Sequence, residues 1–234
     1  MVIEGANAVI EYIKSDKKIT LIEIYENIKH SRKVQIEELA EKKGIMVKFV
    51  KKRSKNQDGI TAIVDEELKL MEIEEFIHES VAKEKSIVLI LDQVQDPRNL
   101  GAIIRSADAF GVDIIILPEH GSARVTDTAI KTSTGAISHI PLCYVTNLSQ
   151  AMEKLKKVGY WIYSIDMVGD KTYLEEKYSA KSVILLGSEG FGIRKKVQEK
   201  ADFTVTIPMS GNVNSLNVSV AAGIILSAVH EKIR

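Results

Sequence analysis

Residues 86–118 read SIVLILDQVQDPRNLGAIIRSADAFGVDIIILP, and this stretch decides the fold. It begins with the continuous apolar run SIVLILD and ends with a second one, VDIIILP. Apolar runs of this length are typical of strands that are buried on both faces of a sheet. Between them, apolar residues recur at i, i+3, i+4 and i+7 from Leu100 to Ala107, which predicts a helix over about 99–110. The stretch therefore predicts a strand, a helix and a second strand.

The same alternation continues to the end of the chain. Further apolar runs, PLCYV, YWIYSID, SVILLG and FTVTIP, are separated by segments with helical spacing at 148–158, 193–200 and 214–233. Buried strands that alternate with helices predict an α/β domain with a mostly parallel sheet and helices on both faces. Ligands of such sheets bind beyond the carboxyl ends of the strands. The loops that follow the strands are therefore where functional residues are expected.

A smaller α/β unit precedes this domain. Its pattern predicts helices over 4–12 and 34–43 and strands over 19–25, 45–50 and 60–64. Gly44 is the expected left-handed stop of the second helix. The acidic stretch 65–80 is predicted to be a helical connector, which puts the domain boundary near residue 80. The chain is thus divided into residues 1–80 and 81–234.

The composition excludes several protein classes. With 45% hydrophobic and 27% charged residues, the chain has the composition of a soluble globular protein. No apolar run approaches the roughly 20 residues of a membrane helix, and the first residues lack the pattern of a signal peptide, so no membrane partner and a cytoplasmic location are expected. Cys143 is the only cysteine, which excludes an intramolecular disulfide, and the five histidines show no ligand spacing. We expect no metal, and we expect Cys143 to be buried in packing.

The charge is unevenly distributed, although the net charge is zero. Residues 1–57 carry thirteen Lys and Arg against eight Asp and Glu. Lys51, Lys52 and Arg53 lie in the basic segment FVKKRSKNQ between two predicted strands. Such a segment is either a solvated loop or a patch that contacts RNA phosphates.

The first candidate functional loop leads into the helix predicted at 99–110. Asn99 is well placed to cap this helix. Arg98 and Arg105 are seven residues apart, so they share a helix face away from the apolar stripe. They are either two solvated arginines or, beside a pocket at a strand end, ligands for RNA phosphate, which guanidinium binds in bidentate fashion.

The second loop, LLGSEGFG at 185–192, has its glycines in the order G-x-x-G-x-G. This order differs from the G-x-G-x-x-G fingerprint of dinucleotide binding, which disfavours a nicotinamide-dependent dehydrogenase. The glycines indicate unusual backbone angles or close approach to a ligand. Glu189 within this turn could bind ribose hydroxyls or a cationic partner, or could hold the turn through backbone amides.

The third loop, IPMSGNVNSLNVSV at 207–220, runs from a predicted strand into the last helix. Backbone groups at a strand end can read the edge of an adenine, with Ile207, Met209 and Leu216 as apolar walls. Ser215 and Asn217 are small polar residues at a helix start, and capping explains one of them more easily than both. The helix that follows is rich in small residues, which permit close packing within one subunit or between two.

The three loops, as DPRNLGAIIRSADAFG, LLGSEGFGI and IPMSGNVNSLNVSVAAGI, resemble the three sequence motifs of the SpoU, or TrmH-like, branch of the SPOUT methyltransferases. They occur in the order of the family and, with the strands between them, cover about 86–232. Each alone is a weak match, and all three in order are highly specific. The segments IEGANAVIEYI and DGITAIV are similar, more loosely, to the ribosomal-protein-like substrate-binding domain that precedes the catalytic domain in many members.

This resemblance implies a C-terminal trefoil knot and a homodimer that forms the active site. It implies S-adenosyl-L-methionine as methyl donor, without a metal. Carried over to this chain, the family's donor-binding positions are Gly187, Ile207, Met209, Ser215, Leu216 and Asn217. Its catalytic arginine falls on Arg105, with Asn99 and Glu189 as supporting polar residues, and Arg98 joins Lys51, Lys52 and Arg53 as candidate RNA ligands. Phe191 departs from the family, in which this position is commonly polar or acidic.

The reaction implied is 2′-O-ribose methylation of structured RNA. The N-terminal segment favours a guanosine of 23S ribosomal RNA, free or in an assembling large subunit. A tRNA 2′-O-ribose methyltransferase is the alternative, although such relatives usually lack this segment. A non-catalytic RNA-binding or ribosome assembly factor on the same fold is a third possibility, against which the presence of Asn99, Arg105, Glu189 and Asn217 argues.

Overall fold

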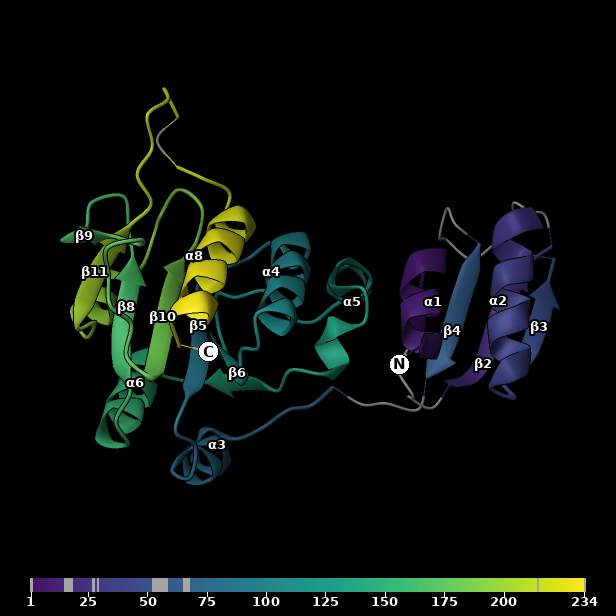
Figure 1. Ribbon diagram of the computed structural model, residues 1–234, viewed down its shortest axis with the longest axis horizontal. Helices are drawn as coiled ribbons and strands as arrows, with labels where there is room; N and C mark the ends of the chain where they lie inside the picture. Colours follow the sequence, from purple (N-terminus) through teal and green to yellow (C-terminus); the bar gives the residue numbers. More distant parts are fainter. Residues whose placement is uncertain are drawn as a thin grey trace.

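The stretch that decides the fold forms strand β5 (Ser86–Asp92), helix α4 (Pro97–Ala109) and strand β6 (Ile114–Pro118). They belong to the larger of two α/β units in the computed structural model (Figure 1). The structure describes residues 2–14, 19–26, 28, 30–51, 59–64, 68–213 and 215–233.

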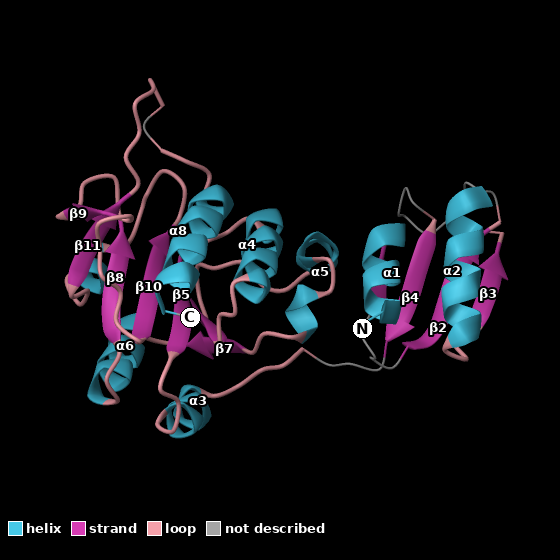
Figure 2. Cartoon of the chain, in the orientation of Figure 1, coloured by secondary structure: helices cyan, strands magenta, loops and turns pink. Residues whose placement is uncertain are grey.

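The larger unit is built on a seven-stranded sheet with the strand order β7-β6-β5-β10-β8-β11-β9. All neighbouring strands in it pair in parallel. The strands not yet introduced are β7 (Leu142–Val145), β8 (Trp161–Ile165), β9 (Lys171–Thr172), β10 (Lys181–Gly187) and β11 (Phe203–Thr206). Because the strands run in one direction, the loops that follow them meet at one edge of the sheet (Figure 2).

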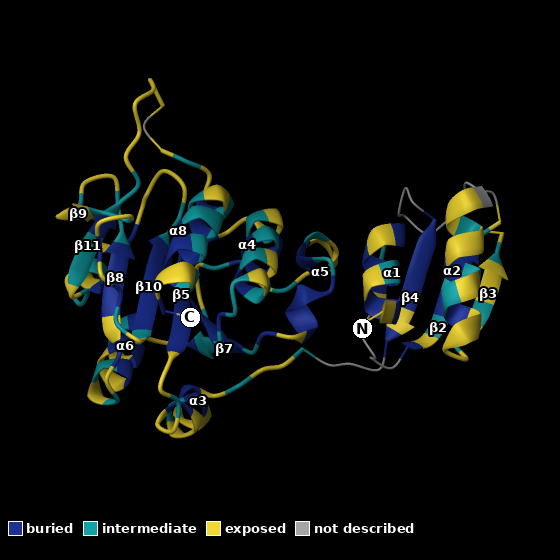
Figure 3. Cartoon of the chain, viewed as in Figure 1, coloured by how far each residue is buried: buried dark blue, intermediate teal, exposed yellow. Residues whose placement is uncertain are grey.

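Two apolar layers explain why β5 is a continuous apolar run. Ile87 and Leu89 belong to the core cluster that contains α4, whereas Val88 and Ile90 belong to a second cluster. The side chains of a strand point alternately to opposite faces of its sheet, so a strand covered on both sides must be apolar at every position. Figure 3 shows these central strands as buried throughout.

Helices cover both faces of this sheet. The cluster with α4 also contains residues of α5 (Asp127–Ser133), the 3-10 helix η1 (Ala136–Ser138) and α8 (Val218–Ile233). The second cluster contains residues of α3 (Ile73–Ser80), α6 (Leu148–Lys157) and α7 (Lys195–Gln198). The expected α/β class, with a mostly parallel sheet between two helical layers, is confirmed.

The smaller unit has a four-stranded sheet with the order β1-β4-β2-β3. Only β2 and β3 pair in parallel, and the other two pairs are antiparallel. Its elements are β1 (Val2–Glu4), α1 (Ala6–Lys14), β2 (Ile19–Tyr25), α2 (His30–Lys42), β3 (Val47–Val50) and β4 (Ile60–Val64). A separate core fills it, and Gly44 has the predicted left-handed backbone with φ +64°.

Several predicted boundaries were wrong. Helix α4 begins at Pro97 and is capped by Asp96, whose carboxylate accepts a hydrogen bond from the Arg98 N–H at 2.8 Å, so Asn99 is not the cap. Proline suits the first position of a helix because the N–H that it lacks would have no helical partner there. Helix α8 begins at Val218 rather than at 214, and α2 begins at His30 rather than at 34.

The acidic connector is helical over only half of its predicted length. Helix α3 covers Ile73–Ser80, and residues 65–67 lie outside the described part of the chain. Phe76 of α3 is 2% exposed within the second cluster of the larger unit. By packing, this helix therefore goes with the larger unit. Strands β1 and β9 and helix α5 were not predicted, because each is too short to show a period.

None of the helices in the described part of the chain has the length and apolar character needed to cross a bilayer. The trefoil knot that the family resemblance implies stays a prediction.

Candidate functional site

A pocket of about 450 Å³ lies at the carboxyl ends of three neighbouring strands. Its walls come from 165–167 after β8, from 186–193 after β10, and from residues between β11 and the first turn of α8. The volume is in the range of sites that hold small molecules and cofactors. The second and third loops singled out in the sequence therefore form one pocket, where a parallel sheet is expected to bind ligands.

The glycine loop after β10 folds back on itself tightly. Ser188 and Gly192 exchange backbone hydrogen bonds of 3.1 and 3.0 Å. A Cβ on Gly187 would lie only 2.1 Å from the carbonyl carbon of Gly192, so no other residue fits here without movement of the backbone. Gly190 and Gly192 have φ values of +84° and +66°, which side chains disfavour. The glycine spacing thus reflects a close backbone approach and a turn.

A polar cluster links all three predicted loops at the edge of the pocket. The Asn99 amide donates to Oε1 of Glu189 at 3.2 Å. The Asn217 amide donates to Oδ1 of Asn99 at 3.0 Å and also to Glu189. Asn99 and Asn217 are 118 residues apart in the chain. The structure therefore brings together three residues that were each singled out in a different loop.

The start of α8 determines how Asn217 and Glu189 are held. Oδ1 of Asn217 accepts hydrogen bonds from the Ser219 N–H at 2.9 Å and from the Ser219 hydroxyl, so Asn217 caps the helix. Glu189 accepts a hydrogen bond from the Val218 N–H at 3.1 Å. A carboxylate at the first N–H groups of a helix is stabilised by the helix dipole. Capping thus explains Asn217, whereas Ser215 lines the pocket.

A buried ion pair that the sequence reasoning missed anchors the other end of the glycine loop. Asp92, the last residue of β5, is fully buried. Its carboxylate accepts hydrogen bonds from the backbone N–H and from Nε of Arg194, both at 2.8 Å. A buried carboxylate needs such partners, because its charge has lost the solvation of water. The sequence did contain a signal for this pair, because Asp92 is an acidic residue at the end of a strand that is otherwise almost wholly apolar.

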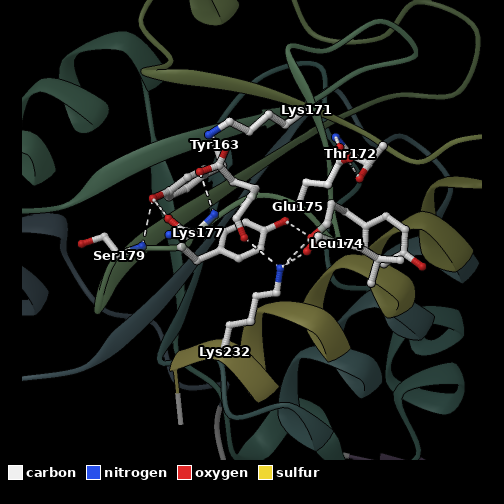
Figure 4. Close-up of polar contacts among 11 residues, drawn as sticks. Tyr163, Lys171, Thr172, Leu174, Glu175, Lys177, Ser179 and Lys232 are labelled. Atoms are coloured by element: carbon white, nitrogen blue, oxygen red, sulfur yellow. Dashed lines mark hydrogen bonds and ion pairs between the residues drawn. The ribbon is translucent and has the colours of Figure 1, made fainter.

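The loop that follows β8 is fastened to the last helix. After lining the pocket at 165–167, the chain passes through β9 towards β10. The ammonium group of Lys232 in α8 donates to the carbonyl oxygens of Leu174 at 2.5 Å and Glu176 at 2.8 Å (Figure 4). The N–H of Ser179 donates to the hydroxyl of Tyr163 at 2.9 Å, and burial raises the pKa of that tyrosine. The last helix therefore contacts both the glycine loop, through Val218, and the segment between β9 and β10, through Lys232.

Arg105 lies apart from this pocket. It is exposed, and it lines a second hollow of about 250 Å³ between the two units, together with Glu11 of α1 and Asp108 of α4. His139 lies at the same hollow, with its Nδ1 3.3 Å from a carboxylate oxygen of Asp108. Arg105 is six residues from Asn99 along α4, which is about 9 Å along the helix axis. Within one chain, the arginine predicted to be catalytic therefore does not line the pocket.

The remaining predicted residues have simpler surroundings. Gly187, Ile207, Met209, Ser215 and Leu216 line the pocket. Arg98 is exposed in the first turn of α4, and Lys51 is exposed just after β3. Lys52 and Arg53 lie outside the described residues.

Cys143 is buried in β7, as expected, and its own thiol is unreactive. Its exposed fraction is 1%, and burial raises the pKa of the thiol to about 12. The neutral thiol is a weak nucleophile and a poor metal ligand. In the part of the chain that the structure describes, no three His, Cys, Asp or Glu residues gather into a group that could hold a metal ion.

Comparison with known proteins identifies relatives over nearly the whole chain. The SpoU rRNA methylase family matches residues 86–227, and the RNA 2′-O ribose methyltransferase substrate-binding family matches residues 2–67. YacO of Bacillus subtilis, named as a TrmH family tRNA/rRNA methyltransferase, is 37% identical over 97% of this chain and 94% of its own length. A relative of the same name from Staphylococcus saprophyticus is 41% identical over 99% of this chain and 96% of its own length.

A solved structure has the same fold. The SpoU methyltransferase AviRb from Streptomyces viridochromogenes, in complex with the cofactor AdoMet, superposes with a TM-score of 0.74. The two sequences are 20% identical, and the match covers 99% of this chain and 89% of AviRb. Both units of the chain therefore occur together in a known protein.

Proposed function

Because the chain belongs to the SpoU rRNA methylase family of RNA methyltransferases, we propose that it methylates a ribose 2′-hydroxyl of structured RNA. The methyl donor in this proposal is S-adenosyl-L-methionine. The observation that carries it is the pocket at the strand ends, with the Asn99, Glu189 and Asn217 cluster at its edge.

The residues present fit this donor. The pocket volume of about 450 Å³ suits a molecule of its size. Ile207 and Leu216 offer apolar walls for an adenine, and Gly187 lets the backbone of Gly192 approach closely enough to close the turn that lines the pocket. Met209 and Ser215 complete the lining near the start of α8. When bound, the donor would supply an electrophilic methyl group on a sulfonium sulfur; its transfer to the ribose oxygen would break the sulfur–methyl bond and leave S-adenosylhomocysteine.

Glu189 and Asn99 are positioning residues in this proposal. The hydrogen bonds of the cluster join the first turn of α4, the glycine loop and the start of α8. A rigid junction keeps the glycine loop and the start of α8 at a constant separation, and this separation sets the width of the donor pocket. Pre-organised contacts of this kind reduce the entropy lost when two reactants are aligned.

Arg105 is the proposed catalytic residue. Its guanidinium is a reluctant base, because an arginine keeps its proton in proteins. It therefore clamps the phosphate next to the target ribose and stabilises the negative charge that develops on the attacking oxygen. A phosphate oxygen or a water molecule takes the proton.

A homodimer would bring Arg105 to a donor pocket. In its own chain this side chain lines a separate hollow, and it is exposed to solvent. Two copies related by a twofold axis can present Arg105 of one subunit to the pocket of the other. Ser219, next to the pocket-lining Val218, is half-buried in one chain, whereas Gly223 faces Ser106 of α4 in the same chain.

The proposed substrate is a guanosine in 23S ribosomal RNA, free or in an assembling large subunit, and the proposed location is the cytoplasm. The match of residues 2–67 to a substrate-binding family supports a large structured RNA. Lys51 and Arg98 are exposed candidates for phosphate contacts. A tRNA target is the second candidate, because the relatives' names include both kinds of RNA.

The test is a map of 2′-O-methyl sites in total RNA from cells with and without the gene. We expect one site in 23S RNA to disappear with the gene and to return with a plasmid copy, but not with an Arg105→Ala copy. Loss of a tRNA mark with unchanged ribosomal RNA would favour the tRNA candidate.

Titration calorimetry with S-adenosylmethionine separates the enzyme from a non-catalytic assembly factor. We expect saturable binding of the donor and of its demethylated product. If the folded chain did not bind S-adenosylmethionine, the proposal that it is an enzyme would be wrong.

A further inference from the structure

Phe191 is the most exposed large apolar side chain among the residues that the structure describes, at 90%. Single exposed apolar residues are common and need no explanation by themselves. This ring differs because it lies at the tip of the glycine loop and lines the mouth of the pocket.

The backbone holds the ring away from the protein. Phe191 lies between Gly190 and Gly192, both with positive φ, inside the turn closed by the Ser188 and Gly192 hydrogen bonds. The Asp92 and Arg194 ion pair fixes the chain just beyond this turn. With 90% of its surface exposed, the ring does not pack on the core, and both of its faces are open to a ligand.

The position of the ring suits the nucleobase of a nucleotide whose ribose is being methylated. Glu189, two residues earlier on the same turn, joins the polar cluster at the pocket edge. A ribose 2′-oxygen that reaches this pocket brings its own base or a neighbouring base to the mouth. Bases unstacked from loops and bulges of RNA commonly stack on aromatic side chains. The ring of Phe191 is therefore suited to stack on an unpaired base.

Basic residues close to Phe191 in the sequence favour RNA over a second protein surface. Arg194, Lys195 and Lys196 lie three to five residues after Phe191, and all three are exposed. The Arg194 guanidinium is paired with Asp92, which leaves the two lysines as the candidates for phosphate. Lysines are depleted in protein–protein interfaces, whereas aromatic rings interleaved with basic residues are typical of sites for single-stranded nucleic acid.

We propose that Phe191 stacks on an unpaired nucleobase at or next to the methylated nucleotide, with Lys195 and Lys196 beside the RNA backbone. This inference rests on the proposed function and names a binding contact for it. Stacking is tolerant of base identity, so this ring contributes to affinity and orientation and little to sequence choice.

The experiment measures methyl transfer from labelled S-adenosylmethionine to unmodified transcripts of 23S RNA and, in parallel, of tRNAs. The variants are Phe191→Ala, Phe191→Leu and Phe191→Tyr, with Val81→Ala as a control at an apolar residue that is 63% exposed outside the pocket. For Phe191→Ala we expect the KM for RNA to rise roughly 5- to 100-fold. Phe191→Tyr keeps the stacking face and should restore the wild-type KM, whereas Phe191→Leu should not.

Two further measurements exclude other roles for the ring. Calorimetry with S-adenosylmethionine should give similar affinities for wild type and Phe191→Ala, and a loss that matches the loss of turnover would identify a donor contact instead. Light scattering should give equal masses for both, and a smaller mass for Phe191→Ala would identify a contact between two copies. Either result overturns the stacking proposal.

Failure of the proposed function would give a different pattern. A folded wild-type chain that methylates neither RNA overturns the function and this inference together. A wild-type chain that methylates RNA, beside a Phe191→Ala variant with an unchanged KM, overturns the stacking alone.

Discussion

The pocket at the strand ends and the hollow around Arg105 are built in opposite ways. The pocket is formed by loops held at both ends, through the Asn99, Glu189 and Asn217 cluster and the Asp92 and Arg194 ion pair. The hollow lies between the two units, and the exposed side chains of Glu11 and Arg105 lie beside uncharged residues such as Tyr12 and Thr134 in its lining. The first region is therefore built by one unit of the chain. The second depends on both units and presents an exposed cation.

This difference suits a reaction in which the pocket binds the methyl donor and Arg105 binds the RNA phosphate. A small donor molecule fits a pocket formed by loops that are held in place. The phosphate of a large RNA reaches an exposed arginine more easily than it would reach the inside of such a pocket. The difference also supports the proposed dimer, because Arg105 has to meet a donor pocket that its own chain does not offer it.

The largest effect is expected when the two regions are damaged in separate chains. Arg105→Ala should lower kcat by about 100- to 1,000-fold and leave binding of S-adenosylmethionine unchanged. Gly187→Ala should weaken donor binding so far that the variant is inactive at donor concentrations that saturate the wild type. If Arg105 acts on the partner's pocket, random mixing of the two inactive variants gives heterodimers with one intact site, and about a quarter of the wild-type activity should return. Activity assays after co-refolding measure this, and no recovery would mean that Arg105 acts within its own chain.

The second prediction compares two glycines in the pocket loops. A Cβ on Gly187 would meet backbone at 2.1 Å, whereas a Cβ on Gly211 would meet nothing within 4 Å. Gly187→Ala should therefore weaken donor binding by roughly 10- to 100-fold or more, because the glycine loop must shift. Gly211→Ala should bind as the wild type does. Calorimetry measures both, and equal affinities would show that the loop adapts freely.

The third prediction concerns the ion pair at the base of the glycine loop. Asp92→Asn should destabilise the fold by about 2 kcal/mol, less than the roughly 3–5 kcal/mol usual for breaking a buried pair, because Arg194 is 43% exposed and water can solvate it. A chain of this size should then melt about 4–8 °C lower. Calorimetric melting of Asp92→Asn, Arg194→Ala and the double variant measures the coupling. Additive losses would show that the pair does not act as a unit.

The smallest effect is expected at Cys143, which packs on the sheet face opposite α4. Because burial raises the pKa of its thiol to about 12, the folded chain should remain unmodified by maleimide at pH 8. The unfolded thiol ionises near pH 8.5, so the contribution of this group to stability is full below that pH and declines as the pH rises towards 12. Mass spectrometry measures labelling, which also reports whether the other variants stay folded. Rapid labelling of the wild type would contradict the buried packing.

The parts of the fold that the sequence predicted correctly depend on local patterns. The apolar runs at 86–92 and 114–118 are long enough to show a strand buried on both faces. The spacing from Leu100 to Ala107 likewise predicted the buried face of α4. The helix starts were wrong because capping depends on one or two side chains, and Asp96 and Asn217 compete with several neighbours of similar chemistry.

The candidate site could be predicted as a set of loops but not as a set of contacts. Glu189 stood out because it is charged within a glycine turn, yet its partners Asn99 and Val218 lie 90 and 29 residues away. Asp92 and Arg194, 102 residues apart, carried no common motif. Arg105 was predicted together with Asn99 and Glu189, and the structure separates it from them along α4.

By itself, the sequence determined the chemistry available and the layers of the fold, since both follow from residue types and short periods. The alternation of strands and helices, the glycines of the tight turn and the family motifs all belong to this level. Only the tertiary structure decided which polar groups share hydrogen bonds, which of them line the pocket, and that Phe191 is presented to solvent at its mouth. The reason is physical: hydrogen bonds and burial depend on the distances between side chains, and those distances exist only once the parallel strands have brought distant loops to one edge of the sheet.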